Sequence, residues 1–249
     1  MNILICGVGG RMGREVAKLA LEGFRQVRPI AGMDVIPVDT REFRSYTDWD
    51  AVEEMPDCII DFSNHAGTPA LLRYAVEKKI PTVIATTGHT QEEALVIEQA
   101  AKKIPIFHSA NMSIGIALLV ELAQKVAATF PDADIEIIEK HHNRKLDAPS
   151  GTALLLANAI REVRQDASFV YGRGGQAKRR PEEIGIHAIR MGNIIGEHEV
   201  IVGTDTQTIT LKHEAHSRSL FAEGAIAAAA YLVGRPAGLY DMKSMLHVK

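Results

Sequence analysis

Short apolar runs alternate with segments of helical periodicity through the first half of the chain. The apolar runs predict strands, and the segments between them repeat apolar residues at helical spacing. Because the connections are short, this alternation predicts a parallel sheet wound by right-handed crossovers. The predicted strands cover residues 2–6, 27–33, 57–62, 82–86 and 104–109, and the predicted helices cover residues 14–21, 68–78 and 91–103.

After residue 112 the pattern changes to fewer and longer strands, which indicates a second domain. Helices are predicted at 114–129 and 152–163, with a strand at 135–139 before the second helix. Three strand candidates follow at 184–190, 194–202 and 207–215, and the tight turns between them predict antiparallel neighbours. The apolar residues Ile195, Val200, Val202, Ile209 and Leu211 predict that the sheet face turned away from the helices is a subunit interface.

The predicted fold class is therefore α/β. An N-terminal Rossmann-like, doubly wound parallel sheet is expected over residues 1–112, completed by C-terminal helices within 221–249. An α+β domain with a mixed, largely antiparallel open sheet is expected over residues 113–220.

A glycine-rich turn joins the first predicted strand to the first helix. It reads Gly7-Val-Gly-Gly-Arg-Met-Gly13, and strand, glycine turn and helix form the layout of a dinucleotide-binding unit. Met12 replaces the third small residue of the standard spacing, so the loop reads better as Gly7-x-x-Gly10-x-x-Gly13. A glycine loop alone also opens methyltransferases and ordinary strand–helix turns.

Asp34 ends the second strand, about 20 residues after the glycine loop, where a carboxylate hydrogen-bonds the adenosine ribose. A solvated strand end is an equally good interpretation of this residue alone. Val35 follows, without an arginine beside it to bind a 2′-phosphate. This favours NADH slightly over NADPH, although Arg11 or Arg14 could bind the phosphate instead.

Residues 136–152 gather titratable groups between a strand and a helix. His141, His142, Lys145 and Asp147 lie in the connecting loop. An imidazole and an ammonium close to an anion site suggest proton donation to a small acidic substrate. A charged surface loop is the alternative interpretation.

The helix after this loop begins at a Pro-Ser-Gly-Thr corner. Ser150 is predicted to be its N-cap. The backbone N–H groups of Gly151 and Thr152, with the helix dipole, would bind a carboxylate.

Composition narrows the class of protein. The chain has 249 residues with a net charge of −3, which argues against general binding to nucleic acid or to a membrane surface. Its two cysteines lie in apolar runs and are expected to be reduced, which fits a cytoplasmic protein. No apolar run is long enough to span a bilayer, and no histidine spacing predicts a metal site.

The motifs together resemble the 4-hydroxy-tetrahydrodipicolinate reductase family of the diaminopimelate route to lysine. The segment at 139–152, EKHHNRKLDAPSGT, is similar to the family signature E-x-H-H-x-x-K-x-D-x-P-S-G-T. The glycine loop, Ala-Thr-Thr-Gly at 85–88, Ser-Ala-Asn-Met at 109–112, Arg190 with Gly-Glu-His at 196–198, and Gly-Leu-Tyr-Asp at 238–241 also match. The resemblance covers essentially the whole chain.

The resemblance implies specific roles. His141 would be the proton donor and acceptor, Lys145 a proton donor, and His142, Ser150, Gly151 and Thr152 would bind the substrate. The implied cofactor contacts are Gly7, Val8, Gly9, Gly10, Arg11, Met12, Asp34, Ala85, Thr86, Thr87, Ser109, Ala110, Asn111 and Met112.

The implied reaction is NAD(P)H-dependent reduction of a cyclic dicarboxylate, with loss of water from C4, hydride addition at C4 and protonation of the neighbouring carbon. The resemblance also implies a homotetramer built through the second domain's sheet. The alternatives are another two-domain dehydrogenase, such as one acting on aspartate, or a nucleotide-sensing module without catalysis.

Overall fold

The structure is a computed structural model that describes residues 1–247, and its contacts divide the chain into two compact units. Unit 1 combines residues 1–113 with the C-terminal segment that begins at residue 218. Unit 2 consists of residues 114–217.

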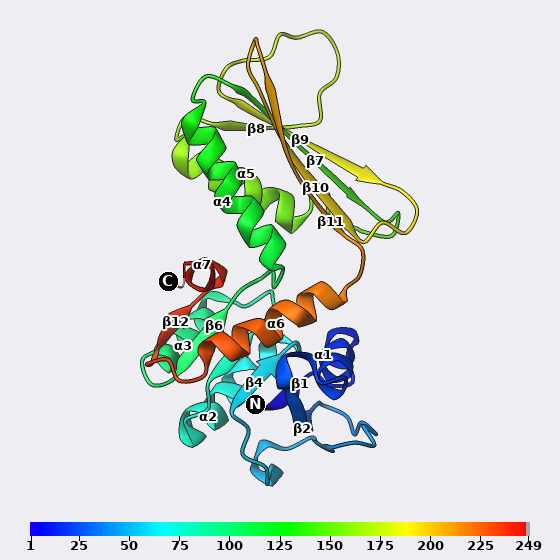
Figure 1. Ribbon diagram of the computed structural model, residues 1–249, viewed down its shortest axis with the longest axis vertical. Coiled ribbons are helices and arrows are strands. Elements are labelled where there is room, and N and C mark those ends of the chain that lie inside the picture. The colour runs from blue at the N-terminus through cyan, green and yellow to red at the C-terminus, as the bar shows by residue number, and fades with distance from the viewer. Residues whose placement is uncertain (248–249) are drawn as a thin grey trace. The chain divides into compact units, whose positions relative to one another are not determined.

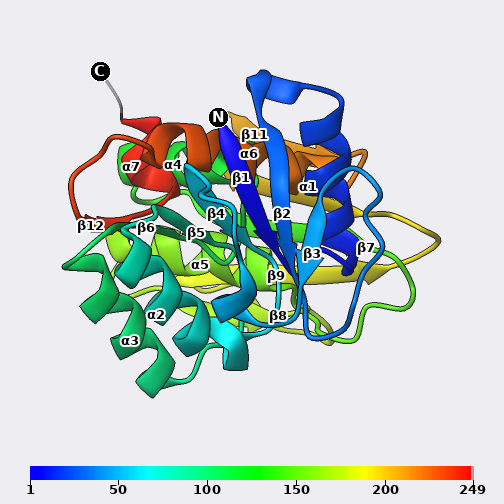
Figure 2. The same cartoon turned by 90° about the horizontal axis from the view of Figure 1, so that it is seen from below.

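Unit 1 is built on a seven-stranded parallel sheet in the order β12-β6-β5-β4-β1-β2-β3. Helices α1 and α6 cover one face and helices α2 and α3 cover the other (Figure 1, Figure 2). The strands are β1 (Asn2–Cys6), β2 (Arg28–Met33), β3 (Arg44–Tyr46), β4 (Cys58–Asp61), β5 (Thr82–Ile84), β6 (Pro105–His108) and β12 (Gly238–Tyr240). The helices are α1 (Arg11–Leu21), α2 (Thr68–Lys78), α3 (Gln91–Ala101), α6 (Ser219–Leu232) and α7 (Met242–Leu246), with short 3₁₀ turns η1 (Phe24–Gln26), η2 (Trp49–Ala51) and η3 (His65–Gly67).

The predicted doubly wound sheet is confirmed. Ile3, Leu4 and Ile5 are all fully buried, as expected for a parallel strand covered on both faces. Two edge strands, β3 and β12, were not predicted because three residues carry too short a pattern to identify. α1 also begins at Arg11, three residues before its predicted start, because the glycine loop turns directly into the helix.

Unit 2 contains a five-stranded mixed sheet in the order β11-β10-β7-β9-β8. Helices α4 (Ile114–Thr129) and α5 (Gly151–Val163) pack together against one face of it (Figure 1). Its strands are β7 (Asp134–His141), β8 (Ser168–Tyr171), β9 (Glu183–Arg190), β10 (Gly196–Gly203) and β11 (Thr208–Ala215). Among residues 1–247, no helix combines the length and the apolar character needed to cross a membrane.

The mixed sheet is confirmed, but one predicted neighbour pair is wrong. β9 does not pair with β10, because β7 lies between them, parallel to β9 and antiparallel to β10. The five residues 191–195 that connect β9 to β10 are long enough to cross two strand spacings of about 4.8 Å each. β10 and β11 are antiparallel neighbours, as predicted.

The predicted apolar interface face is also wrong. Val200 and Val202 are buried in the cluster that contains residues of α4 and α5, and Leu211 packs against that cluster. Their cross-strand register places Ile209 opposite Val202 and Leu211 opposite Val200, so these residues share the face covered by the helices. The opposite face, here called the open face, carries the alternate residues of β7 and β10.

Candidate active site

The glycine loop of unit 1 leaves no space for side chains at two of its positions. Gly7 has a φ of +80°, and a Cβ there would lie 2.6 Å from the carbonyl oxygen of Phe62. A Cβ on Gly13 would collide with the carbonyl group of Gly7. The Gly7-x-x-Gly10-x-x-Gly13 spacing therefore has a steric cause in the turn between β1 and α1.

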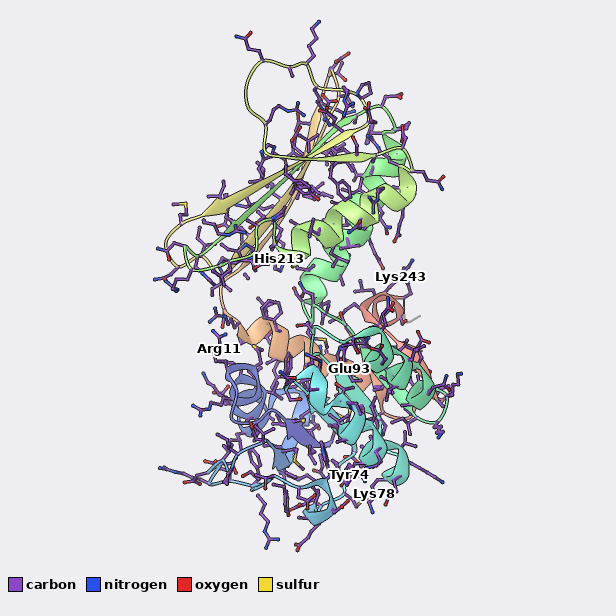
Figure 3. All side chains as sticks on the ribbon, turned by 180° about the vertical axis from the view of Figure 1, so that it is seen from behind. Arg11, Tyr74, Lys78, Glu93, His213 and Lys243 are labelled. Carbon is purple, nitrogen blue, oxygen red and sulfur yellow. The ribbon has the colours of Figure 1, made fainter. Side chains whose placement is uncertain are left out.

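Helix α1 begins directly after this loop without a side-chain cap. Gly10 is its N-cap residue and no side chain hydrogen-bonds there, so backbone N–H groups and the helix dipole form a site suited to phosphate. Arg11 stands at the helix start (Figure 3), where it is exposed. These features fit the pyrophosphate of a dinucleotide.

Asp34 connects the end of β2 to the glycine loop. Its Oδ2 accepts a hydrogen bond from the Gly9 N–H at 2.8 Å, and its Oδ1 accepts one from the Val35 N–H at 2.8 Å. A carboxylate has further lone pairs for ribose hydroxyls. A cavity of about 1060 Å³ is lined by Asp34, Gly7, Gly9 and Gly10, which is large enough for part of a dinucleotide.

Two other predicted cofactor segments follow strands β5 and β6 at the same edge of the sheet, but they do not line this cavity. Thr86 is buried, and its hydroxyl donates to Asp61 Oδ2 at 2.8 Å. Asp61 also accepts from the hydroxyl of Ser63 at 2.5 Å. Ser109 donates to the Asn111 carbonyl at 2.7 Å. The fully buried Asp61 therefore holds two loops of this edge together.

In unit 2, strand β7 carries two polar residues on its buried face. Along β7 the buried positions alternate as Ile135, Ile137, Glu139 and His141. Because residues two apart in a strand share a face, the glutamate and the histidine continue a row of core isoleucines. Buried ionisable groups on such a face require partners.

Glu139 has partners on every side. Its Oε2 lies 2.5 Å from His141 Nδ1, and its two carboxylate oxygens accept from the Arg190 guanidinium at 2.8 and 2.7 Å. Its Oε1 also accepts from the Ser150 N–H at 2.9 Å. Arg190 Nη2 further donates to the Asp147 carbonyl at 2.6 Å. One carboxylate thus joins β7, β9 and the start of α5.

These contacts and burial determine the charges of Glu139 and His198. Burial raises the pKa of the Glu139 carboxyl, but the hydrogen bonds from His141, Arg190 and the Ser150 N–H outweigh burial and hold the pKa at about 2. Glu139 is therefore an anion at neutral pH. Burial, assisted by the neighbouring His141, lowers the pKa of His198 to about 3, so that imidazole is neutral.

The start of α5 has the geometry predicted from the sequence. Ser150 is the N-cap, and its Oγ accepts from the Ala153 N–H at 3.2 Å, which confirms the capping prediction. His198 Nε2 lies 3.1 Å from the same hydroxyl. Gly151 is exposed, and an added Cβ would meet nothing within 4 Å. The helix start is therefore accessible to an anion.

Two further predicted residues, His142 and Lys145, lie in the loop between β7 and α5. Lys145 Nζ pairs with Asp147 Oδ1 at 2.8 Å, and this hydrogen bond lowers the pKa of the Asp147 carboxyl. The Lys145 N–H donates to the His142 carbonyl at 3.1 Å, which closes a turn after β7. The structure therefore gathers His141, His142, Lys145 and the α5 start in one segment of unit 2.

Both units match models of one protein family. The description "Dihydrodipicolinate reductase, N-terminus" matches residues 1–112, and "Dihydrodipicolinate reductase, C-terminus" matches residues 115–246. The chain belongs to the dihydrodipicolinate reductase family.

Relatives in this family align with almost the full length of the chain. A 4-hydroxy-tetrahydrodipicolinate reductase of Caldanaerobacter subterraneus subsp. tengcongensis is 47% identical, over 99% of this chain and 98% of its own. The 4-hydroxy-tetrahydrodipicolinate reductase of Clostridium tetani is 43% identical, over 99% of this chain and 97% of its own. A solved structure, dipicolinate-bound dihydrodipicolinate reductase from Paenisporosarcina sp. TG-14, has a TM-score of 0.82 at 26% identity and covers 97% of both chains.

The sequence patterns did not predict a role in the site for Glu139, Arg190, His198 or Asp61. The alternation along β7 could have identified Glu139, because a glutamate in phase with buried isoleucines needs a cation nearby. No comparable local signal identifies Arg190, since its contact with Glu139 depends on the pairing of β9 beside β7.

We predict that His198 makes the protein less stable in acid. With a pKa of about 3 when folded and about 6.5 when unfolded, His198 binds its proton more readily in the unfolded chain. The free energy of unfolding therefore falls as the pH is lowered from about 6.5 towards 3, by up to about 1.4 kcal/mol per pH unit. Urea unfolding at a series of pH values should show a shallower slope for His198→Gln, and parallel curves for the two proteins would contradict the assignment.

Proposed function

We propose that this protein reduces 4-hydroxy-tetrahydrodipicolinate to tetrahydrodipicolinate in diaminopimelate and lysine biosynthesis. The observation that carries the proposal is the segment around α5, where an imidazole, an ammonium and the exposed start of a helix lie in one stretch of chain. Full-length relatives named 4-hydroxy-tetrahydrodipicolinate reductase support the same reaction.

Unit 1 is proposed to bind a nicotinamide cofactor, which supplies the hydride when bound. The glycine loop and the start of α1 would hold the pyrophosphate, and Asp34 would accept from the ribose hydroxyls. The segments after β5 and β6 are proposed to contact the rest of the cofactor. The cavity beside Asp34 and the uncapped α1 support this assignment.

Unit 2 is proposed to bind the substrate. The N–H groups of Gly151 and Thr152 would hold one substrate carboxylate at the positive end of the α5 dipole. His142 and Ser150 would complete the binding site. The Paenisporosarcina relative has dipicolinate bound, and this small ring dicarboxylate supports the same class of ligand here.

His141 and Lys145 are proposed to supply protons. Water is lost as the C4 hydroxyl leaves with a proton from a neighbouring ring carbon, which gives a conjugated imine. Addition of hydride at C4 of that imine leaves an electron-rich carbon beside C4, and an acid must protonate that carbon. The His141 imidazole, next to an anionic carboxylate, is suited to hold that proton, and the Lys145 ammonium stabilises negative charge on the substrate.

NADH is proposed to be preferred slightly over NADPH. Asp34 is followed by Val35, which is 91% exposed and offers no donor to a 2′-phosphate from its side chain. The negative charge of a 2′-phosphate beside Asp34 would be repelled. Arg14, which also lines the cavity, is the residue that could offset this repulsion.

The first prediction concerns the proton donors. His141→Gln and Lys145→Ala should each lower kcat by about 10²-fold or more, because each removes a positioned acid or cation, with the affinity for NADH unchanged. The exposed neighbour variant Arg144→Ala serves as the control. Steady-state kinetics with 4-hydroxy-tetrahydrodipicolinate measure this effect, and near wild-type turnover of both variants would remove the assignment. In the same assay, turnover of aspartate in place of this substrate would favour another dehydrogenase.

The second prediction concerns Asp34. Asp34→Ala should weaken the binding of NADH more than the binding of NADPH, because the carboxylate would accept a hydrogen bond from the 2′-hydroxyl that NADPH lacks. Titration of the purified variant with each reduced cofactor measures the two dissociation constants. An equal loss for both would show that Asp34 does not contact the ribose.

The third prediction concerns assembly. We propose a homotetramer formed through the open face of the unit 2 sheet, where Ile138 and Ile201 are partly exposed. Light scattering after size exclusion should give a mass four times that of one chain, and Ile201→Lys should lower it. A monomeric wild-type protein would contradict this proposal.

A further inference from the structure

Glu139 contacts three parts of the proposed site although it faces away from solvent. It is fully buried, and its carboxylate contacts the His141 ring, the backbone at the start of α5 and the Arg190 guanidinium. We infer that the buried Glu139–Arg190 ion pair is a positioning device that sets the His141 tautomer and fixes the substrate-binding helix start relative to it. This inference rests on the proposed function of His141.

The tautomer follows from the hydrogen bond. A carboxylate is an acceptor, so the Nδ1 atom that lies 2.5 Å from Glu139 carries a proton. Nε2 is then the ring nitrogen that exchanges a proton with the substrate. Residue 196 is a glycine, and a Cβ there would lie 3.2 Å from Nε2. The absence of that side chain leaves space beside the exchanging nitrogen.

Arg190 keeps this carboxylate in place and ionised. Its guanidinium binds both oxygens of Glu139, the bidentate geometry that gives the strongest carboxylate pairs. The same guanidinium donates to the carbonyl of Asp147, whose side chain pairs with Lys145. The ion pair therefore also anchors the loop that carries Lys145.

The helix start is held by the same group. The Ser150 N–H donates to Glu139 Oε1, while the N–H groups that follow it belong to the first turn of α5. A displacement of Glu139 would move both the His141 ring and the anion-binding turn. A role in positioning therefore predicts linked losses in proton transfer and in substrate binding, whereas a role in folding alone does not.

Several charged or titratable groups lie near His141 together with Glu139. Arg190 on β9 lies behind the carboxylate, the neutral His198 on β10 stacks edge-on at 5.2 Å, and Lys145 with Asp147 lies in the adjoining loop. Of these groups, Glu139 is the anion in direct contact with the imidazole. Removing its charge makes the protonated imidazole less stable.

The test is the pH dependence of turnover in Glu139→Gln, which keeps the side-chain shape and removes the charge. We expect kcat to fall by about 10²-fold, the substrate KM to rise, the KM for NADH to stay unchanged, and the alkaline limb of the kcat profile to move to lower pH. Glu197→Gln, the same change on β10 where the carboxylate pairs with Lys140, is the matched control. An unshifted limb with a wild-type kcat would overturn the inference.

A second comparison separates positioning from misfolding. Glu139→Asp keeps the charge and should retain the wild-type alkaline limb despite a lower kcat. Wild-type circular dichroism of both variants reports that unit 2, which contains Glu139, is folded. Glu139→Gln added to His141→Gln should lower kcat by less than tenfold, because Glu139 acts on proton transfer mainly through that ring. A further tenfold loss in the double variant would overturn the inference. Wild-type turnover of His141→Gln alone would instead reject the proposed function.

Discussion

The site of unit 2 depends on one buried carboxylate. Glu139 stands in a row of core residues on β7, and a charge in that position is stable because Arg190, His141 and the Ser150 N–H surround it. Removing any one partner would leave a buried group unsatisfied, which costs more than an exposed contact of the same kind. The same contacts therefore stabilise this part of the sheet and position the side chains of the proposed active site.

The proposed anion sites of the two units are built in similar ways. Unit 1 uses an uncapped helix start after a glycine loop, where Gly7 and Gly13 leave space for backbone alone. Unit 2 uses a helix start whose Ser150 cap is itself held by Glu139. In both, backbone N–H groups supply positive charge without a flexible side chain.

Much of the fold could be predicted from local patterns, because the periodicity of a strand or a helix is visible within a short stretch of consecutive residues. The parallel sheet, the helix start at Ser150 and the glycine turn were all predicted in this way. The neighbour of β9 was not, since pairing beside β7 depends on contacts between residues about 50 positions apart, such as Arg190 with Glu139. The prediction that Val200 faces a subunit interface was also wrong. Alternation along a strand assigns residues to two faces, but it does not indicate which face the helices cover.

We propose that Glu139 holds the proton of His141 on Nδ1 and leaves Nε2 to exchange with the substrate. Nitrogen-15 NMR of the histidine-labelled protein over a pH titration tests it, with the His141 signals assigned by their loss in His141→Gln. We expect Nδ1 to stay protonated throughout and Nε2 to gain and lose the proton. A signal in which Nε2 stays protonated while Nδ1 titrates would contradict it.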